Sequence, residues 1–363
     1  MIEWLAQLAR AQDSGKPGVS VAVASCKGSV PREAGTRMLV TTSEVCGTIG
    51  GGHLEFKAIE IARDMLDSGG TLALQRFPLG ASLGQCCGGL VNLLFEPVSP
   101  DAAWVRQAMA FLEKGENCVA VTPVRGNTGK LLVTSRSVHG NLGGTFGGAH
   151  DADAIERARE QLNSPQCVSA ASTVLSLAGE EYFFESIAAP DFDIVLFGAG
   201  HVGRALVRIL SGLPCRVTWV DSRDDEFPRE LPVNVEKRVS EFPEDEVTGA
   251  RAGSYFLVMT HNHQLDQKLC EQIFNRGDYA YFGMIGSLSK RRQFERRLAA
   301  RGISPARFTE LTCPIGSCGI ESKEPMAIAV SVACELLQRR QSMQQSGAAI
   351  ATLHARNVNL TSR

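Results

Sequence analysis

The chain is 363 residues long, and at about 150 residues per domain this length predicts two domains, or three. Hydrophobic residues make up 44% and charged residues 21% of the sequence, which excludes wholesale disorder and predicts a globular protein with a sizeable core. The formal net charge of -2 excludes a global attraction to nucleic acid or to an anionic membrane, so any anion must be bound locally. No apolar run reaches about 18 residues, and no basic segment precedes an apolar one at the start, so we expect a cytoplasmic protein.

The cysteines and glycines of the sequence indicate which kinds of site to expect. The eleven cysteines are scattered, and an odd number in a chain of this length predicts free thiols rather than a disulfide scaffold. No CxxC pair is present, so the sequence predicts no zinc knuckle. The 36 glycines gather in clusters instead of being spread evenly, and we expect the functional sites at these clusters.

Residues 1–98 predict an N-terminal mixed α/β domain. Trp4, Leu5 and Leu8 lie on one face of a short helix, and a β-type run begins at Val19. Loops that contain glycine separate the later elements. We expect helices at 4–8 and 54–66, and strands at 19–25, 38–42, 71–77 and 90–98.

Residues 99–190 carry weaker patterns. We interpret this segment as a connecting region that either links two domains or completes the sheet of the first. Its expected elements are a helix at 101–115 and strands at 117–124, 130–136 and 182–187.

Residues 191–340 alternate strands with helices, which is typical of a doubly wound, Rossmann-like parallel sheet. The tail, 341–363, has no clear period, and we expect a loose end or a docking segment. The expected strands of this domain are 193–197, 215–221, 254–260, 279–286 and 308–313, and the expected helices are 198–213, 265–275, 287–302 and 324–341.

A dinucleotide-binding fingerprint lies in this second domain. Gly198, Gly200 and Gly203 form GxGxxG between a strand and a helix, and Asp221 ends the next strand at about the expected spacing of 20 residues. The glycines permit a tight turn and a close approach of backbone amides to a phosphate at the helix N-terminus. The alternative is that they serve helix–strand packing only.

Polar residues follow several strands of the same domain. His201 begins the helix after the first strand, and His261, Lys290 and Cys313 follow later strands. Because ligands of a doubly wound sheet bind outside the carboxyl ends of its strands, this content predicts a site for a polar, phosphate-bearing ligand. The alternative is that each is an ordinary loop residue.

The first domain carries a second glycine cluster. Gly50, Gly51 and Gly52 precede a helix, and successive amides of this kind form an anion-binding nest. Glu55 lies in the first turn of that helix, and Arg32 lies in an exposed loop upstream. A purely structural hinge is the alternative.

The adjacent thiols Cys86 and Cys87 lie in a loop flanked by glycine. An exposed thiolate is a soft ligand for molybdenum or copper(I) and can also carry sulfur. The alternative is that both cysteines are buried and act as small apolar side chains.

These motifs together resemble the xanthine dehydrogenase accessory protein (XdhC) family, which is related to the CoxI group. The resemblance covers roughly residues 15–98 and 190–340 and matches the middle of the chain poorly. The matching segments are GSVPREAGTRMLV, CGTIGGGHLE and CCGG, followed by LFGAGHVGRAL, VDSRDDEFP, MTHNHQLD, YFGMIGSLSKRRQFERRL and CPIGSCGIESKEPMAIAVSVACELL.

The resemblance implies a cytoplasmic accessory protein rather than an enzyme. Such a protein binds the molybdenum cofactor (molybdopterin) as cargo, protects it while its terminal sulfur ligand is installed, and delivers it to a molybdenum hydroxylase such as xanthine dehydrogenase. A cysteine desulfurase is a further candidate partner, a homo-oligomer is a candidate assembly, and we expect neither nucleic acid nor a membrane as a partner. The resemblance places these residues in the family's motifs as candidate cofactor-binding residues: Arg32, Gly50, Gly51, Gly52, Glu55, Cys86, Cys87, Gly198, Gly200, His201, Gly203, Asp221, His261, Lys290 and Cys313.

Two other functions stay open at this point. An NAD(P)-dependent oxidoreductase is favoured by the fingerprint and by Asp221, although no substrate domain is recognisable. A nucleotide-sensing regulator is the third candidate, and it lacks a DNA-reading element or a basic domain. Within the accessory-protein hypothesis, Cys86 and Cys87 are the candidate contacts to molybdenum or to its sulfur.

Overall fold

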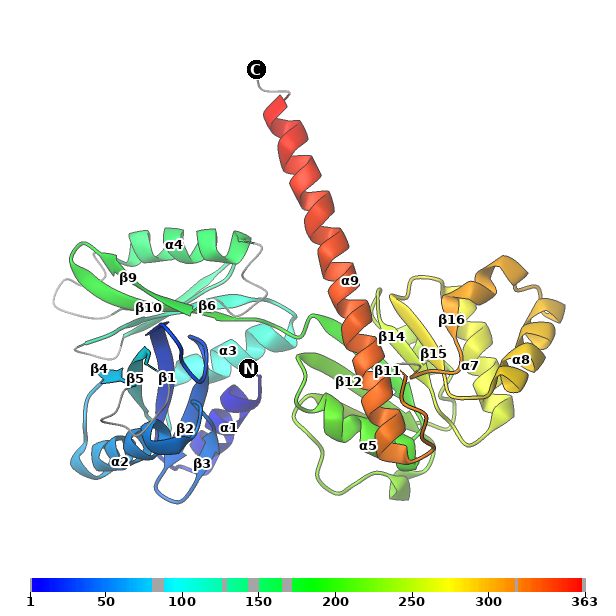
Figure 1. The fold of residues 1–363 in the computed structure, drawn as a ribbon, viewed down its shortest axis with the longest axis horizontal. Coiled ribbons are helices and arrows are strands. Elements are labelled where there is room, and N and C mark those ends of the chain that lie inside the picture. The colour runs from blue at the N-terminus through cyan, green and yellow to red at the C-terminus, as the bar shows by residue number, and fades with distance from the viewer. Residues whose placement is uncertain are drawn as a thin grey trace. The chain divides into compact units, whose positions relative to one another are not determined.

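The computed structural model describes residues 2–79, 88–125, 129–142, 150–164, 172–316 and 319–360. The chain divides into two compact units, Met1–Ala189 and Pro190–Arg363 (Figure 1). In the described residues, no helix is both long enough and apolar enough to cross a bilayer.

The first unit begins with an antiparallel sheet. Its strand order is β3 (Val45–Gly47), β2 (Arg37–Thr41), β1 (Gly18–Lys27), β5 (Leu90–Val98) and β4 (Ala73–Pro78). The helix α2 (Gly52–Ser68) buries Leu54, Ala58 and Ala62, which are spaced four residues apart, against apolar side chains of β1 and β5. This sheet and helix correspond to the N-terminal mixed α/β unit predicted from the sequence.

The segment 99–190 forms a second antiparallel sheet instead of completing the first one. Its order is β8 (Val138–Asn141), β7 (Lys130–Val133), β6 (Cys118–Pro123), β10 (Glu180–Ile187) and β9 (Ser172–Leu177). The helix α4 (Asp151–Asn163) covers its outer face (Figure 1). The helices α1 (Ile2–Asp13) and α3 (Ala103–Glu113) share one apolar cluster with strands of both sheets, so the segment belongs to the first unit.

Four buried charges connect the two sheets of this unit. Arg37 of β2 forms a two-pronged ion pair with Glu185 of β10, and its Nη1 donates to Ser20 Oγ at 2.6 Å. Lys130 Nζ of β7 lies 2.7 Å from Glu96 Oε1 of β5. Burial lowers the pKa of Lys130, and the neighbouring Glu96 carboxylate opposes that shift. Each charge therefore has a partner of opposite sign in the other sheet.

The Arg37–Glu185 pair is expected to carry much of the stability of the first unit. Removing one partner of a buried pair leaves the other charge desolvated and costs about 3–5 kcal/mol, so Arg37→Met should lower the free energy of unfolding by that amount. Trp4 lies 4.5 Å from the Arg37 guanidinium, so tryptophan fluorescence in a urea titration reports the transition directly.

The matched control removes an exposed pair. Lys57 and Glu60 on α2 are about half exposed, and Lys57→Met should cost less than about 1 kcal/mol. If Arg37→Met and Lys57→Met lowered the free energy of unfolding equally, the buried pair would contribute no more to stability than the exposed pair.

The second unit is a six-stranded parallel sheet. Its order is β13 (Val235–Val239), β12 (Cys215–Asp221), β11 (Phe192–Phe197), β14 (Tyr255–Val258), β15 (Tyr281–Met284) and β16 (Leu311–Thr312), which is the Rossmann order with the switch point between β11 and β14. The predicted fold class, an N-terminal mixed α/β domain followed by a doubly wound parallel sheet, is confirmed.

Side-chain alternation along β11 supplies two cores. Ile194 and Leu196 pack toward α5 (His201–Leu210) and α9 (Pro325–Leu360), which lie side by side on one face. Val195 and Phe197 pack toward α7 (His263–Arg276) and α8 (Leu288–Ala300) on the opposite face (Figure 1). Short elements complete the unit: η3 (Asp224–Glu226), α6 (Asp245–Gly249) and η4 (Pro305–Glu310).

Two features of the second unit differ from the sequence-based expectation. The edge strand β13, VEKRV, was not predicted because it is largely exposed and lacks an apolar face. The segment 341–360, expected as a loose end or a docking segment, continues α9 as a helix to Leu360. Good helix formers such as alanine, glutamine and leucine, with no proline, sustain that helix without a strong apolar period.

Candidate functional site

The loop Gly198–Gly203 lies at the switch point of the parallel sheet. Gly198 has a φ of +116°, and a Cβ added there would lie 2.3 Å from the Met259 carbonyl oxygen after β14. A Cβ added at Gly203 would lie 2.2 Å from the Gly198 carbonyl oxygen. Packing of the protein therefore accounts for two of the three fingerprint glycines.

Gly200 is different. It is the N-cap residue of α5, its φ of -70° suits any residue, and a Cβ added there would have no neighbour within 4 Å. Neither the backbone conformation nor the packing of the described residues requires glycine at this position. The open space borders the N-terminus of α5, where backbone amides have no helical partner and favour an anion.

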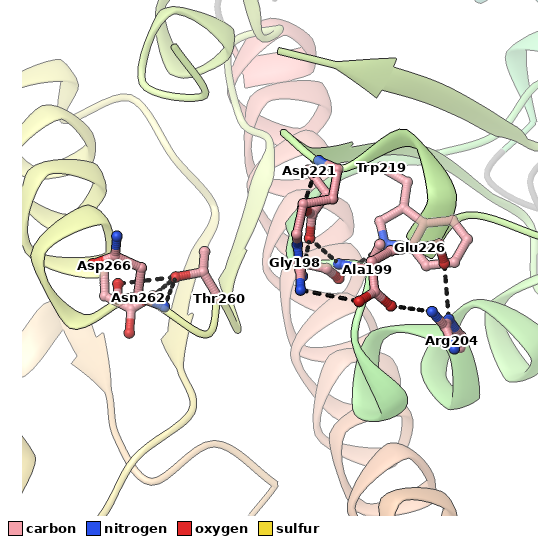
Figure 2. Close-up of polar contacts among 10 residues, drawn as sticks. Gly198, Ala199, Arg204, Trp219, Asp221, Glu226, Thr260, Asn262 and Asp266 are labelled. Atoms are coloured by element: carbon pink, nitrogen blue, oxygen red, sulfur yellow. Dashed lines mark hydrogen bonds and ion pairs between the residues drawn. The ribbon is translucent and has the colours of Figure 1, made fainter. Parts of the chain in front are cut away.

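Asp221 ties the glycine loop to the end of β12. The Ala199 amide donates to its Oδ2 at 2.7 Å, and Trp219 Nε1 donates to the Gly198 carbonyl oxygen at 2.9 Å (Figure 2). Both side chains come from β12, so one strand holds two consecutive residues of the loop. The start of α5 is thereby fixed in place without help from a ligand.

Arg223 occupies the remaining acceptor positions of Asp221. Its backbone N–H and Nε donate to Oδ1 at 3.0 and 2.9 Å, and Nη2 donates to Oδ2 at 2.9 Å. Burial raises the pKa of Asp221, but the hydrogen bonds from Arg223 and Ala199 outweigh it and hold the pKa below its ordinary value. Asp221 is therefore a carboxylate at neutral pH.

A second polar cluster lies across the switch point, after β14. Thr260 Oγ1 donates to Asp266 Oδ1 at 2.6 Å, and the Asn262 N–H donates to Thr260 Oγ1 (Figure 2). Lys290 Nζ lies 2.7 Å from Asp266 Oδ2 and also donates to the Ile285 carbonyl oxygen. Lys290, expected as a ligand contact, is therefore already paired with a fully buried carboxylate.

Asp266 has no role that could be predicted from the sequence. It lies inside the first turn of α7, and no spacing rule connects it to Lys290 on α8. The sequence feature that could have pointed to Asp266 is its position four residues after Asn262, the N-cap of α7. The Asn262 side chain accepts hydrogen bonds from the Gln264 and Leu265 amides.

The other predicted residues of this unit are placed in two ways. His201 and His261 are exposed at the carboxyl edge of the sheet. Cys313 is 2% exposed, and burial raises the pKa of its thiol while nearby Lys290 and Arg291 lower it, with a net increase. Cys313 is therefore a protonated core thiol at neutral pH.

The glycine cluster of the first unit already binds an anion of its own. Glu55 Oε2 accepts from the Ile49 and Gly51 amides at 2.9 and 3.1 Å and from Thr48 Oγ1 at 2.5 Å. Partial burial raises the pKa of Glu55, but the Thr48 hydroxyl and the backbone amides outweigh it and hold the pKa below 4.5. The nest predicted from Gly50, Gly51 and Gly52 forms around a side chain of the chain itself.

The loop that contains Pro31 and Arg32 lies against this nest, and the start of the same loop lies against Gly89. A Cβ added at Gly50 would lie 2.7 Å from Pro31 and 3.4 Å from Arg32 Cγ, and one at Gly28 would lie 3.3 Å from the Gly89 Cα. Arg32 is exposed beside the nest. Cys86 and Cys87 lie outside the described residues, next to Gly88 and Gly89 in the sequence.

Among the described residues, no group of three His, Cys, Asp or Glu side chains is arranged to hold a metal ion.

The motifs and the fold agree with comparisons to known proteins. Residues 194–336 match the XdhC Rossmann domain, and residues 11–78 match the XdhC and CoxI family. The chain belongs to the XdhC and CoxI family. This membership supports an accessory role.

Two known proteins are similar to this chain. The uncharacterized protein YqeB of Escherichia coli (strain K12) is 29% identical over 150 residues, which is 40% of this chain and about a quarter (27%) of the length of YqeB. A crystal structure described as a xanthine dehydrogenase (BH1974) from Bacillus halodurans superposes with a TM-score of 0.66 at 21% identity, over 93% of this chain and 96% of that one. At this identity the second match concerns the fold.

The low pKa of Glu55 makes a pH-dependent prediction for the first unit. A depressed carboxyl pKa stabilises the folded state above pH 4.5, and this stabilisation is lost as the pH falls through the folded-state pKa. Glu55→Gln should therefore cost roughly 1 kcal/mol at pH 7, and the deficit should shrink as the pH is lowered toward 3. Urea titrations of both proteins across this range measure it.

Glu60→Gln, which removes an exposed carboxylate from the same helix, is the control and should change stability by less than about 0.5 kcal/mol. A Glu55→Gln deficit that stays constant with pH would contradict the anionic role of Glu55.

Proposed function

We propose that this chain binds the molybdenum cofactor, protects it while its terminal sulfur is installed, and passes it to a molybdenum hydroxylase such as xanthine dehydrogenase. The observation that carries the proposal is Gly200: a glycine that the protein's own conformation and packing do not require, at a helix N-terminus suited to a phosphate. The molybdenum cofactor is proposed as the phosphate-bearing cargo because the resemblance to the XdhC family implies it, and the family matches support that proposal.

The residues of the second unit suit binding rather than turnover. The first helical hydrogen bond of α5 runs from the Arg204 N–H to the Gly200 carbonyl oxygen at 2.9 Å, so the amides of His201 and Val202 are left to hold a phosphate. The exposed His201 and His261 lie at the same edge and can donate to further polar groups of the cargo. The cargo itself supplies the molybdenum and its oxidisable sulfur.

Sulfur handling falls to the first unit in this proposal. Of the thiols predicted to contact the cofactor, Cys313 is buried, and burial raises its pKa. Cys86 and Cys87 are the other two thiols among those predicted residues, with a cysteine desulfurase as the partner that would supply sulfur.

The second candidate function is an NAD(P)-dependent oxidoreductase. The strand order and the position of Asp221 at the end of β12 favour it. The engagement of Asp221 by Arg223 disfavours NAD(H) as the cofactor, because the carboxylate that would receive the ribose diol is already hydrogen-bonded.

Gly200→Asp should release the cofactor from a folded protein. Aspartate is a favourable N-cap residue, so its carboxylate should cap the α5 amides and leave the stability of the unit unchanged or increased. The same carboxylate repels the phosphate and competes for those amides, so pterin retained per chain should fall at least about tenfold. Fluorescence of the oxidised pterin after purification from molybdate-fed cells measures it.

Gly212→Asp is the matched control, because Gly212 lies beyond the other end of α5 and a Cβ added there would lie 3.8 Å from the Ile209 carbonyl oxygen, without a clash. It adds the same charge and should retain the pterin. Unchanged pterin in a folded Gly200→Asp protein would overturn the proposal.

Alkylation tests the proposed sulfur site. Iodoacetamide should label Cys86 or Cys87 before Cys313, because a buried thiol with a raised pKa holds little thiolate at pH 8. Peptide mass spectrometry with and without bound cofactor measures the order in which the thiols are labelled and their protection by the cofactor.

The Cys86→Ala, Cys87→Ala double variant should bind cofactor but fail to activate a client apo-hydroxylase, and full activation would remove these cysteines from the proposal.

A further inference from the structure

Asp221 occupies the place at which a dinucleotide-binding protein holds the ribose. In that fingerprint the acidic residue after the second strand accepts hydrogen bonds from ribose hydroxyls. A carboxylate offers about four lone-pair positions, two on each oxygen. Whether a ribose can bind here therefore depends on how many of the four are in use.

All four positions are in use within the chain. Oδ1 accepts from the Arg223 N–H and from Arg223 Nε, and Oδ2 accepts from the Ala199 N–H and from Arg223 Nη2, at distances between 2.7 and 3.0 Å. Two of the four bonds come from the backbone and two from the Arg223 side chain. The Asp221 side chain is only 4% exposed, so no further donor reaches it without displacing one of these.

The Arg223 side chain is held from a second direction. Its Nη1 donates to Glu226 Oε1 at 3.0 Å. Glu226 is held in turn by Arg204 of α5, which donates to its carboxylate and, through Nε at 2.8 Å, to its carbonyl oxygen (Figure 2). Displacing the guanidinium would break charge-assisted hydrogen bonds to both Asp221 and Glu226.

We infer that Arg223 is a specificity-determining residue that closes Asp221 to a ribose diol. The crevice then accepts a ligand by its phosphate at the α5 N-terminus and rejects NAD(H), which needs the diol contact as well. This inference rests on the proposed function, since both place the phosphate of the ligand beside Gly200, but it concerns a different residue and a different ligand.

Removing the side chain should reverse the selectivity. In Arg223→Ala the two backbone amides still donate to Asp221, one to each oxygen, and the two positions vacated by Nε and Nη2 lie on different oxygens. Two acceptor positions are the number that a cis-diol requires. Hydrogen bonds to a charged acceptor are individually strong enough that the gain in affinity should be at least about tenfold.

The experiment is a calorimetric titration of NADH into the full chain. Arg223→Ala should bind NADH at least about tenfold more tightly than the wild type, and the additional Asp221→Asn substitution should remove that gain. Arg208→Ala is the matched control, because this exposed arginine on α5 forms no side-chain hydrogen bond or ion pair with the described residues and its removal changes the charge equally. It should bind NADH as the wild type does.

Arg223→Met, which keeps the aliphatic stem, is the second variant and guards against a folding defect in Arg223→Ala. NADH affinities of both variants within twofold of the wild-type affinity would overturn the inference. Pterin content is measured on the same wild-type preparation, so loss of the proposed cofactor function would be seen separately from failure of the Arg223 inference.

Discussion

The Asp221 carboxylate is the contact on which the second unit's site depends. Through the Ala199 amide it holds the glycine loop against β12, and Trp219 of the same strand holds the preceding Gly198 carbonyl. Gly198 in turn lies against the end of β14, so the loop is fixed from both sides of the switch point. Because these contacts are all internal, α5 begins at one defined position and presents its amides to the open space beside Gly200 before any ligand arrives.

The two units use the same chemical device for different purposes. Each has a glycine-rich loop that leads into a helix, with an acidic residue close by. In the first unit Glu55 enters the nest and satisfies its amides, which makes that loop a self-contained structural feature with Arg32 exposed at its side. In the second unit the acidic residue lies on the neighbouring strand and binds the loop from behind, so the helix end stays available to an external anion.

Local periodicity predicted most of the fold, and contacts between distant segments account for what it missed. The strands and helices around the Gly198 loop follow regular apolar patterns, so both the elements and the fold class could be predicted. β13 and the α9 extension lack such patterns, so these two elements could not be predicted. The Arg37–Glu185 pair could not be predicted either, because its residues are far apart in sequence. In the site, spacing located Gly200 and Asp221 but could not show that Arg223 covers the Asp221 carboxylate or that Asp266 pairs with Lys290.

We propose that the Rossmann crevice of this chain holds a pterin cofactor and not NAD(H). The most direct measurement identifies the small molecule that co-purifies with the full chain from molybdate-fed cells, by pterin fluorescence after acid oxidation and by nicotinamide absorbance. The room for a phosphate at Gly200, the engagement of Asp221 by Arg223 and the pterin cargo proposed from the family together predict pterin without NAD(H). Recovery of nicotinamide dinucleotide without pterin would contradict it.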